Sequence, residues 1–252
     1  MLKIRVIPTL LMKDVGLVKG VGFDSSRRVG SAVQAIKVYN MREVDELVLV
    51  DVSASRDGRS PDFEQIDDLA DDCFMPMTVG GGVSSVEHVA RMLQVGADKV
   101  LINTAAVIQP DLVQKSAERF GCQCIVASID VRRNLDGSCE VYTHAGTKGT
   151  GSDPIVMARE LERQGAGELL LTSIDRDGTM EGYDIDLIRC VAEATKIPII
   201  ASGGAGNYHH MADVLKIDGV FGVAAGSIYH FTEQTPRDAK MYLRDQGFKV
   251  RL

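Results

Sequence analysis

The chain has 252 residues, of which 45% are hydrophobic and 25% are charged. These proportions are ordinary for a folded globular protein, and the length is enough to bury a large core without disulfides or metal ions. The formal net charge of −7 argues against a nucleic-acid-binding protein, which would usually carry a basic surface stripe. It does not exclude a phosphorylated ligand, because backbone amides bind phosphate without adding formal charge.

The sequence contains no candidate for a membrane span or a leader. No apolar run approaches the ~18 residues of a membrane helix, and the first residues lack the apolar segment and cleavage site of a signal peptide. Five cysteines without Cys-x-x-Cys spacing indicate reduced thiols, and five histidines show no zinc-ligand spacing. We therefore expect a cytoplasmic protein with no metal, no cofactor and no contact with membranes.

Short runs rich in Val, Ile and Leu recur along the chain and do not alternate apolar with polar residues. This pattern is typical of parallel strands buried on both faces. The expected strands are residues 4–10, 47–50, 75–79, 99–102, 124–129, 169–172, 197–201 and 220–225. The segments expected to form helices between them include residues 33–40, 85–94, 110–120, 154–164, 185–194 and 208–216. Eight such units predict an α/β fold, one (β/α)8 barrel (TIM barrel) that spans residues 1–252 as a single domain.

The two halves of the predicted barrel resemble each other. Residues 75–82 (MPMTVGGG) match residues 197–204 (IPIIASGG), and residues 44–49 match residues 165–171 in outline. Glu46 and Glu168 are separated by about half the length of the chain. The sequence therefore predicts two similar half-barrels of four strand–helix units each.

Glycine-rich turns follow the third and the seventh predicted strand. Glycine lets backbone N–H groups approach an anion without a Cβ in the way, and a phosphate site after strands seven and eight is common in such barrels. The repeat doubles that site and suggests a substrate with two phosphate groups, although tight turns alone would also use glycine. The candidate phosphate-binding residues in and beside these turns are Gly82, Asn103, Thr104, Gly204, Gly226 and Ser227.

Four aspartates follow predicted strands, where barrel enzymes place catalytic groups: Asp51, Asp130, Asp175 and Asp177. A partly buried Asp above an apolar barrel can act as a general acid or base. Asp also caps helices and braces loops, and this alternative stays open, above all for Asp51. Lys19, in the loop after the first strand, can close on an anion or can simply be solvated.

Four charged residues lie at the opposite ends of the strands: Arg5, Glu46, Lys99 and Glu168. Charges at the mouth of an apolar barrel are costly unless they are paired. Two cations and two anions can form a neutral ring there. On fold grounds alone such a ring is read as a stabilising feature, and the functional alternative is a gate for a small neutral molecule.

Several motifs together resemble one family, the cyclase subunit of imidazole glycerol phosphate synthase, over nearly the whole chain. They lie at residues 79–82 (VGGG), 96–100 (GADKV), 102–106 (INTAA), 171–179 (LTSIDRDGT) and 199–206 (IIASGGAG). The resemblance implies a glutaminase subunit at the barrel bottom and ammonia passing through the barrel to a doubly phosphorylated ribonucleotide. It places the ammonia gate at the four charges above and adds Asp177 and Gly178 to the phosphate contacts. It makes Asp130 one of two catalytic aspartates and puts Lys19 on a mobile loop.

The second catalytic aspartate of that family is replaced by Leu11, which cannot transfer a proton. Asp14, three residues on, need not point at the same spot, so the standard reaction is in question. The stretch from Ile7 to Leu11, with residues 73–76 (CFMP) and 136–142 (DGSCEVY), is more similar to a paralogous branch. That branch is associated with acetamidino modification of surface-polysaccharide sugars, such as those of lipopolysaccharide, carried on a nucleotide.

Three interpretations follow. The leading one is an ammonia-using synthase subunit of the acetamidino-forming type, with Asp130, Lys19 and Asp51 as the candidate catalytic residues. The second is a cyclase of histidine biosynthesis, a lyase that has lost or relocated one catalytic group. The third is a non-catalytic conduit that only passes ammonia to a partner enzyme.

Overall fold

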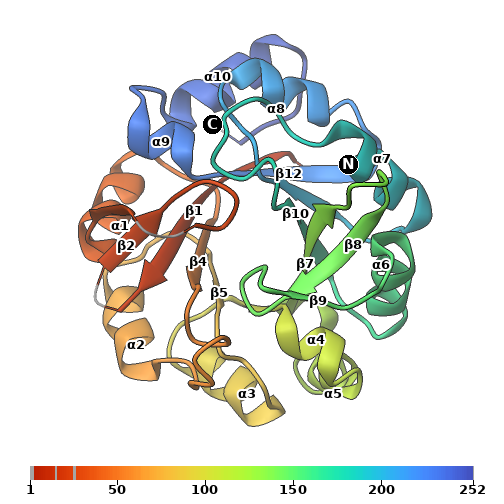
Figure 1. Cartoon of the computed structure of the whole chain (residues 1–252). Helices are drawn as coiled ribbons and strands as arrows, with labels where there is room; N and C mark the ends of the chain where they lie inside the picture. Colours follow the sequence, from red (N-terminus) through yellow and green to blue (C-terminus); the bar gives the residue numbers. More distant parts are fainter. Residues whose placement is uncertain (1–2, 15, 25–26, 252) are drawn as a thin grey trace.

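The computed structural model of the chain describes residues 3–14, 16–24 and 27–251. Within them, eight parallel strands close into a barrel, because β10 pairs with both β11 and β7 at the two ends of the strand order. Helices form a ring around the barrel, as Figure 1 shows in a view down its axis. The barrel strands are β1 (Arg5–Lys13), β4 (Leu47–Asp51), β5 (Met77–Gly80), β6 (Lys99–Ile102), β7 (Ile125–Arg133), β10 (Glu168–Ser173), β11 (Ile199–Ser202) and β12 (Val220–Ala225).

The longer helices pack their apolar faces on the outside of the strands. They are α1 (Ala32–Met41), α2 (Phe63–Asp71), α3 (Val86–Gln94), α5 (Asp111–Phe120), α6 (Pro154–Arg163), α7 (Ile185–Ala194), α8 (Tyr208–Val214) and α10 (Pro236–Asp245). Most begin at a side chain that accepts a hydrogen bond from a first-turn amide, which satisfies a donor that the helix leaves free. These capping residues are Asp62, Ser85, Asp153, Asp184, Asn207 and Thr235.

The barrel interior is a separate apolar cluster that lies inside the strands. Seven of the eight barrel strands each contribute a buried apolar side chain to it, in the described part of the chain. The eighth, β5, contributes the buried hydroxyl of Thr78 instead. The members of the cluster are Ile7, Val48, Leu101, Val126, Leu170, Ile200 and Ala224.

Two hairpins extend beyond the barrel at its C-terminal end. After β1 the chain forms β2 (Gly16–Lys19) and β3 (Arg27–Gly30), and after β7 it forms β8 (Cys139–Thr143) and β9 (Lys148–Gly149). Both hairpins pair antiparallel with the elongated ends of their barrel strands. The expected loop after the first strand is therefore wrong in part, because β1 continues to Lys13 and Lys19 lies in a strand.

The predicted barrel and its eight strands are confirmed, and β6, β12 and α7 match the expected bounds to the residue. Two short helices, α4 (Thr104–Ile108) and α9 (Ser227–Phe231), were not expected. They follow β6 and β12 at matching places in the two halves, and a 3-10 turn (Cys122–Cys124) precedes β7. No helix in the described ranges is both long and apolar enough to cross a membrane.

Candidate functional site

Four charged side chains meet at the N-terminal ends of the barrel strands. Arg5 contacts Glu46 at 2.6 Å and Glu168 at 2.8 Å, and Lys99 contacts the same two carboxylates at 3.1 and 3.0 Å. Cations and anions therefore alternate around a closed ring, which we call the charged ring. The sequence predicted this ring from four residues that lie far apart in the chain.

Glu46 is the most deeply buried member of the charged ring, with 2% of its side chain exposed. Burial works to raise its pKa, but Arg5, Lys99 and a hydrogen bond from the Thr78 hydroxyl together lower the pKa below its ordinary value. Burial likewise opposes the charge of Arg5, and its two carboxylate partners outweigh that effect and raise its pKa. Each member contacts two charges of the opposite sign, so the formal charges of the ring sum to zero.

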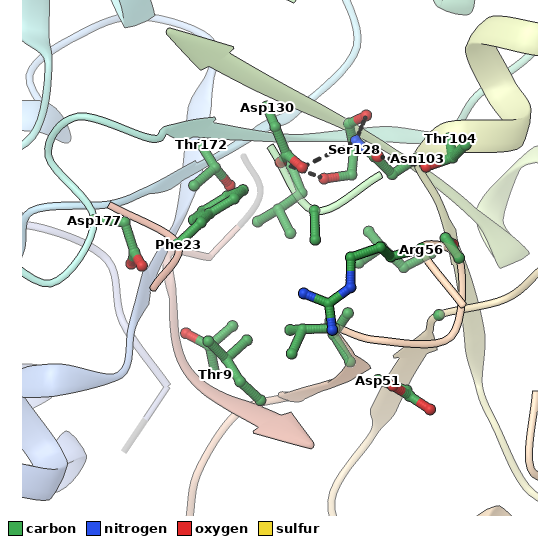
Figure 2. Close-up of a pocket in the computed structure, with 18 of the residues that line it drawn as sticks. Thr9, Phe23, Asp51, Arg56, Asn103, Thr104, Ser128, Asp130, Thr172 and Asp177 are labelled. Atoms are coloured by element: carbon green, nitrogen blue, oxygen red, sulfur yellow. Dashed lines mark hydrogen bonds between the residues drawn. The ribbon is translucent and has the colours of Figure 1, made fainter. Parts of the chain in front are cut away.

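A cavity opens at the opposite end of the barrel, where the carboxyl ends of the strands meet. Figure 2 shows side chains from widely separated elements pointing into it, among them Thr9, Asp130 and Thr172. Its floor includes Leu101 and Leu170, which also belong to the apolar interior of the barrel. The cavity therefore sits directly above that interior, at the end where barrel enzymes do their chemistry.

Asp130, near the end of β7, is the buried carboxylate of this cavity, with 8% of the residue exposed. It accepts hydrogen bonds from the Asn103 amide at 3.1 Å and from the Ser128 hydroxyl at 3.3 Å. Burial raises its pKa to about 7; the Ser128 hydrogen bond opposes that change, and the negative charge of Asp177 adds to it. A carboxyl with a pKa near 7 can both accept and return a proton at neutral pH, which suits a general acid or base.

Lys19 lies inside the cavity with only 4% of the residue exposed, so a solvated lysine is the wrong interpretation. Its ammonium donates to both carboxylate oxygens of Asp177, at 2.8 and 2.9 Å. Asp177 belongs to the loop after β10, far away in the chain. The pair joins the first hairpin to the second half of the barrel beside the predicted phosphate site.

Asp51, at the end of β4, uses its carboxylate to brace the loop that follows. One oxygen accepts from the backbone amides of Ser53 and Ala54 and from the Ser53 hydroxyl, at 2.8 to 3.0 Å. The other contacts Arg59 at 3.2 Å. Although Asp51 borders the cavity, this geometry favours the loop-bracing alternative over a catalytic role.

Asp175 lies outside the main cavity, in a surface cleft beside Arg133 and Arg176. It accepts a hydrogen bond from the backbone amide of Arg133 at 2.8 Å. Of the four aspartates that the sequence singled out, the structure therefore brings only Asp51, Asp130 and Asp177 to the cavity, within the described residues.

Leu11 projects into the cavity from β1, on the same face of the strand as Thr9. In the strand register it pairs with Val50 of β4, and Val50 also lines the cavity. The wall at this point is thus apolar on both strands. Asp14, exposed beyond the end of β1, does not line the cavity, so it does not restore a carboxylate at this place.

The predicted phosphate residues gather in two groups. Gly82, Asn103 and Thr104 line the main cavity. A smaller recess beside it is lined by residues from the loops after β10, β11 and β12, and it includes Asp177, Gly178, Gly204, Gly226 and Ser227. Thr9, Asp177 and Ser202 border both spaces, so the two groups face one continuous site.

Both turns also need glycine for steric reasons. A Cβ on Gly82 would meet the Arg59 carbonyl oxygen at 2.5 Å, and one on Gly204 would collide with the Gly182 carbonyl oxygen. Both residues have positive φ angles, of +71° and +108°. The tight-turn explanation is therefore sufficient for these two residues, and evidence for an anion must come from elsewhere.

The Ser227 hydroxyl supplies such evidence, because it is buried and has no hydrogen-bond partner among the described residues. An unpaired buried polar group is costly, and those in native structures usually have a ligand, an ion or a water as partner. Ser227 lines the smaller recess, beside Gly226. A ligand oxygen bound in this recess would satisfy the hydroxyl.

The sequence prediction missed several cavity residues, of which two carry large side chains. Phe23, from the loop between β2 and β3, and Arg56, from the loop after β4, both reach into the cavity (Figure 2). Neither belongs to a repeat or a glycine-rich motif, so the sequence carried no signal for them. No group of three or more potential metal ligands comes together in the described ranges.

Comparisons with known proteins agree with this geometry. The family model described as "Histidine biosynthesis protein" matches residues 5–235. A relative from Streptococcus mutans serotype c, described as imidazole glycerol phosphate synthase subunit HisF, is 44% identical over 251 residues, which cover 100% of both chains.

Proposed function

Because the chain belongs to the histidine biosynthesis protein family, we propose that it uses ammonia from a glutaminase partner to aminate a phosphorylated substrate. In this proposal the glutaminase subunit docks over the charged ring, and the substrate binds in the cavity at the other end of the barrel. The observation that carries the proposal is the continuous path of barrel residues between these two ends.

This path begins at the charged ring and ends at the cavity floor. The Thr78 hydroxyl donates to Glu46 of the ring at 2.7 Å from within the barrel. Above it lies the apolar interior, which reaches the cavity at Leu101 and Leu170. A passage that opened through this apolar interior would favour neutral ammonia over the ammonium ion, because burying an unpaired charge is far more costly than burying a small neutral molecule.

The two groups of anion-binding candidates support a substrate with two phosphate groups. In the main cavity the turn at Gly82 lies beside Asn103 and Thr104, and in the smaller recess the turn at Gly204 lies beside Ser227. The matched halves of the barrel place equivalent turns on opposite strands. One substrate that spans both groups would hold its reacting carbon near Asp130.

For the reaction itself, we propose the formation of an acetamidino group on a nucleotide-linked sugar for surface polysaccharide. Leu11 is the supporting observation, since it lines the cavity at the position where the cyclase family is expected to carry its second aspartate. Adding ammonia to an electrophilic carbon needs one proton acceptor, which Asp130 supplies. It does not need a second carboxylate in the same role.

The competing candidate is the cyclase reaction of imidazole glycerol phosphate synthase. It is favoured by the full-length similarity to a relative that is described as a subunit of that enzyme. In this case the reaction would proceed with Asp130 as the buried cavity carboxylate that is not paired with a cation, among the residues described.

One set of assays separates the candidates. The protein is incubated with an ammonium salt and the doubly phosphorylated ribonucleotide of histidine biosynthesis, and imidazole glycerol phosphate is measured. Our proposal predicts no robust turnover. Robust turnover would establish the cyclase reaction and rule out both sugar amidination as the primary function and a purely passive conduit.

The Leu11→Asp variant then shows whether the rest of the site still suits that substrate. Its matched control is Leu11→Asn, which has a similar size and polarity but cannot exchange a proton at neutral pH. Cyclase activity in the aspartate variant alone would show that Leu11 is what excludes the reaction. The positive assay for our proposal joins the protein with its glutaminase, an acetamido sugar nucleotide, a nucleoside triphosphate and the amidotransferase-like protein that the resemblance to the paralogous branch implies as a further partner.

A further inference from the structure

Arg56 carries the positive charge that reaches into the middle of the cavity. It lies in the loop between β4 and α2, and Figure 2 shows its guanidinium pointing into the open space of the cavity. Its side chain is 46% exposed, and its one polar contact in the described part of the chain joins Nε to Asp57 at 3.4 Å. Both terminal nitrogens of the guanidinium are therefore available to a ligand.

The neighbouring cations are already engaged. Lys19 is held by Asp177 at 2.8 Å. Arg59, three residues after Arg56, donates to the Ser53 hydroxyl at 2.6 Å and contacts Asp51 at 3.2 Å. Asp57, the contact of Arg56, does not line the cavity. Arg56 thus differs from Lys19 and Arg59, because its one carboxylate contact among the described residues lies outside the cavity.

A guanidinium in this position has a clear chemical preference. Its planar fork of N–H donors matches the oxygens of a phosphoryl or carboxylate group and binds them through two parallel hydrogen bonds. The apolar wall at Leu11 and Val50 lowers the local polarity and strengthens such a bond. The buried Asp130 marks the reacting end of the same space.

We propose that Arg56 forms a third anion subsite, which binds a phosphoryl group on the reacting carbon of the substrate. The inference deepens the proposed function and rests on it. Replacing an amide oxygen by nitrogen requires that this oxygen leave, and a phosphoryl ester of the imidate form, made with a nucleoside triphosphate as the phosphoryl donor, is a suitable activated substrate. Arg56 specifies such a substrate and stabilises the group that departs.

In this step ammonia displaces phosphate from the activated substrate. The nitrogen lone pair of ammonia forms a C–N bond to the imidate carbon, and the C–O bond to the phosphoryl oxygen breaks. The bonding electron pair leaves with phosphate, which remains on Arg56. The proton lost by the attacking nitrogen passes to the Asp130 carboxylate. No oxidant or reductant takes part.

The subsite can be tested by binding alone, without turnover. Inorganic phosphate is titrated into the full chain labelled with ¹⁵N, and the Nε–Hε signal of each arginine is followed by NMR. The Arg56 signal, identified by its absence in Arg56→Gln, is expected to shift and saturate together with the Gly82 and Gly226 amides. The matched control signal is that of Arg119, an exposed arginine of α5 outside the cavity, which is expected not to saturate in the same range.

The Arg56 signal could instead respond to phosphate in the same way as the Arg119 signal, while the two glycine amides saturate. That result would overturn the third subsite and leave the proposal of two phosphate sites unaffected. If all three cavity signals stay unmoved, the two-phosphate proposal fails with it. Circular dichroism and thermal unfolding of Arg56→Gln show whether the variant keeps its fold.

A kinetic split tests the role of Arg56 in the step itself. With the activated sugar nucleotide and ammonium, Arg56→Gln should lower kcat roughly 10- to 100-fold with a smaller change in KM, since a charge-assisted hydrogen bond is lost as the leaving group departs. Arg56→Lys should recover part of kcat, and Arg119→Gln should match the wild type. Equal kcat in Arg56→Gln and the wild type would contradict the role.

Discussion

Charged side chains come together at both ends of the barrel, but the two ends differ in how completely these charges are paired. At the N-terminal end, Arg5 and Lys99 each contact both Glu46 and Glu168, so each described charge of the ring has two partners. At the C-terminal end, Asp130 is buried without a cation beside it in the described structure, and Arg56 faces the cavity.

The pairing of the charges indicates which end of the barrel stabilises the fold and which end can transfer protons. In the ring each charge faces two opposite charges, an arrangement typical of a stabilising feature. In the cavity burial raises the pKa of Asp130 to about 7, and carboxyls perturbed in this way cluster at functional sites. The contrast supports our proposal that the reaction takes place in the cavity and that ammonia enters at the ring.

The largest expected effect comes from removing the carboxylate of the cavity. Asp130→Asn keeps the size of the side chain but replaces one carboxylate oxygen by an amide nitrogen and cannot accept a proton, so ammonia-dependent turnover should fall about 10²–10⁴-fold. Steady-state kinetics with ammonium at a fixed pH measure this. Asp51→Asn is the comparison, because its carboxylate braces a loop, and an equal loss in both variants would refute the special role of Asp130.

The same substitution should change the pH dependence of stability. The pKa of Asp130 is raised from 3.8 to about 7 in the folded protein, so the folded state binds this proton more tightly than the unfolded state. Its contribution to the free energy of unfolding is therefore full below pH 3.8 and is lost as the pH rises toward 7, by roughly 4 kcal/mol in total. Urea unfolding of Asp130→Asn should lack this decline, and parallel pH profiles for both proteins would contradict the raised pKa.

At the other end, Glu46→Gln should destabilise the fold by about 1.5–3 kcal/mol, because it leaves Arg5 and Lys99 to share one carboxylate. Because the pKa of Glu46 is lowered in the folded protein, the loss of stability in the variant should be largest at pH values above 4.5, the ordinary pKa of this group. The loss should shrink as the pH falls through the pKa that Glu46 has in the folded protein. Denaturant unfolding at several pH values measures it. The control is Glu160→Gln, whose exposed pair with Arg163 is expected to contribute little.

The smallest effect should appear at the Ser227 hydroxyl. Ser227→Ala removes a buried group that has no partner in the described structure, so stability should stay the same or rise slightly. Phosphate affinity at the smaller recess should nevertheless fall about tenfold, as measured from the Gly226 amide by NMR. Ser116→Ala, which removes an equally buried and unpaired hydroxyl on α5, should leave phosphate binding unchanged.

The parts of the molecule that follow from local pattern were predicted well. After its initial lysine the strand Lys99–Ile102 is apolar, Val220–Ala225 has no charged or hydrogen-bonding side chain, and the charged ring follows from residue types at strand starts. The exposed strand Arg27–Gly30 carries no such pattern and forms by pairing with β2. Lys19 is buried because Asp177, distant in the chain, holds it. Arg56 faces the cavity through loop geometry that no spacing of residues encodes.

The transfer of nitrogen between the two ends tests the account most directly. The complete assembly is supplied with glutamine labelled with ¹⁵N in its amide group, an acetamido sugar nucleotide, a nucleoside triphosphate and an excess of unlabelled ammonium, and the product is analysed by mass spectrometry. If ammonia passes through the charged ring, the product of the wild-type protein should keep the ¹⁵N label. The product of the Lys99→Met variant should contain a larger share of unlabelled nitrogen. A wild-type product with the isotope ratio of the surrounding ammonium would contradict the account.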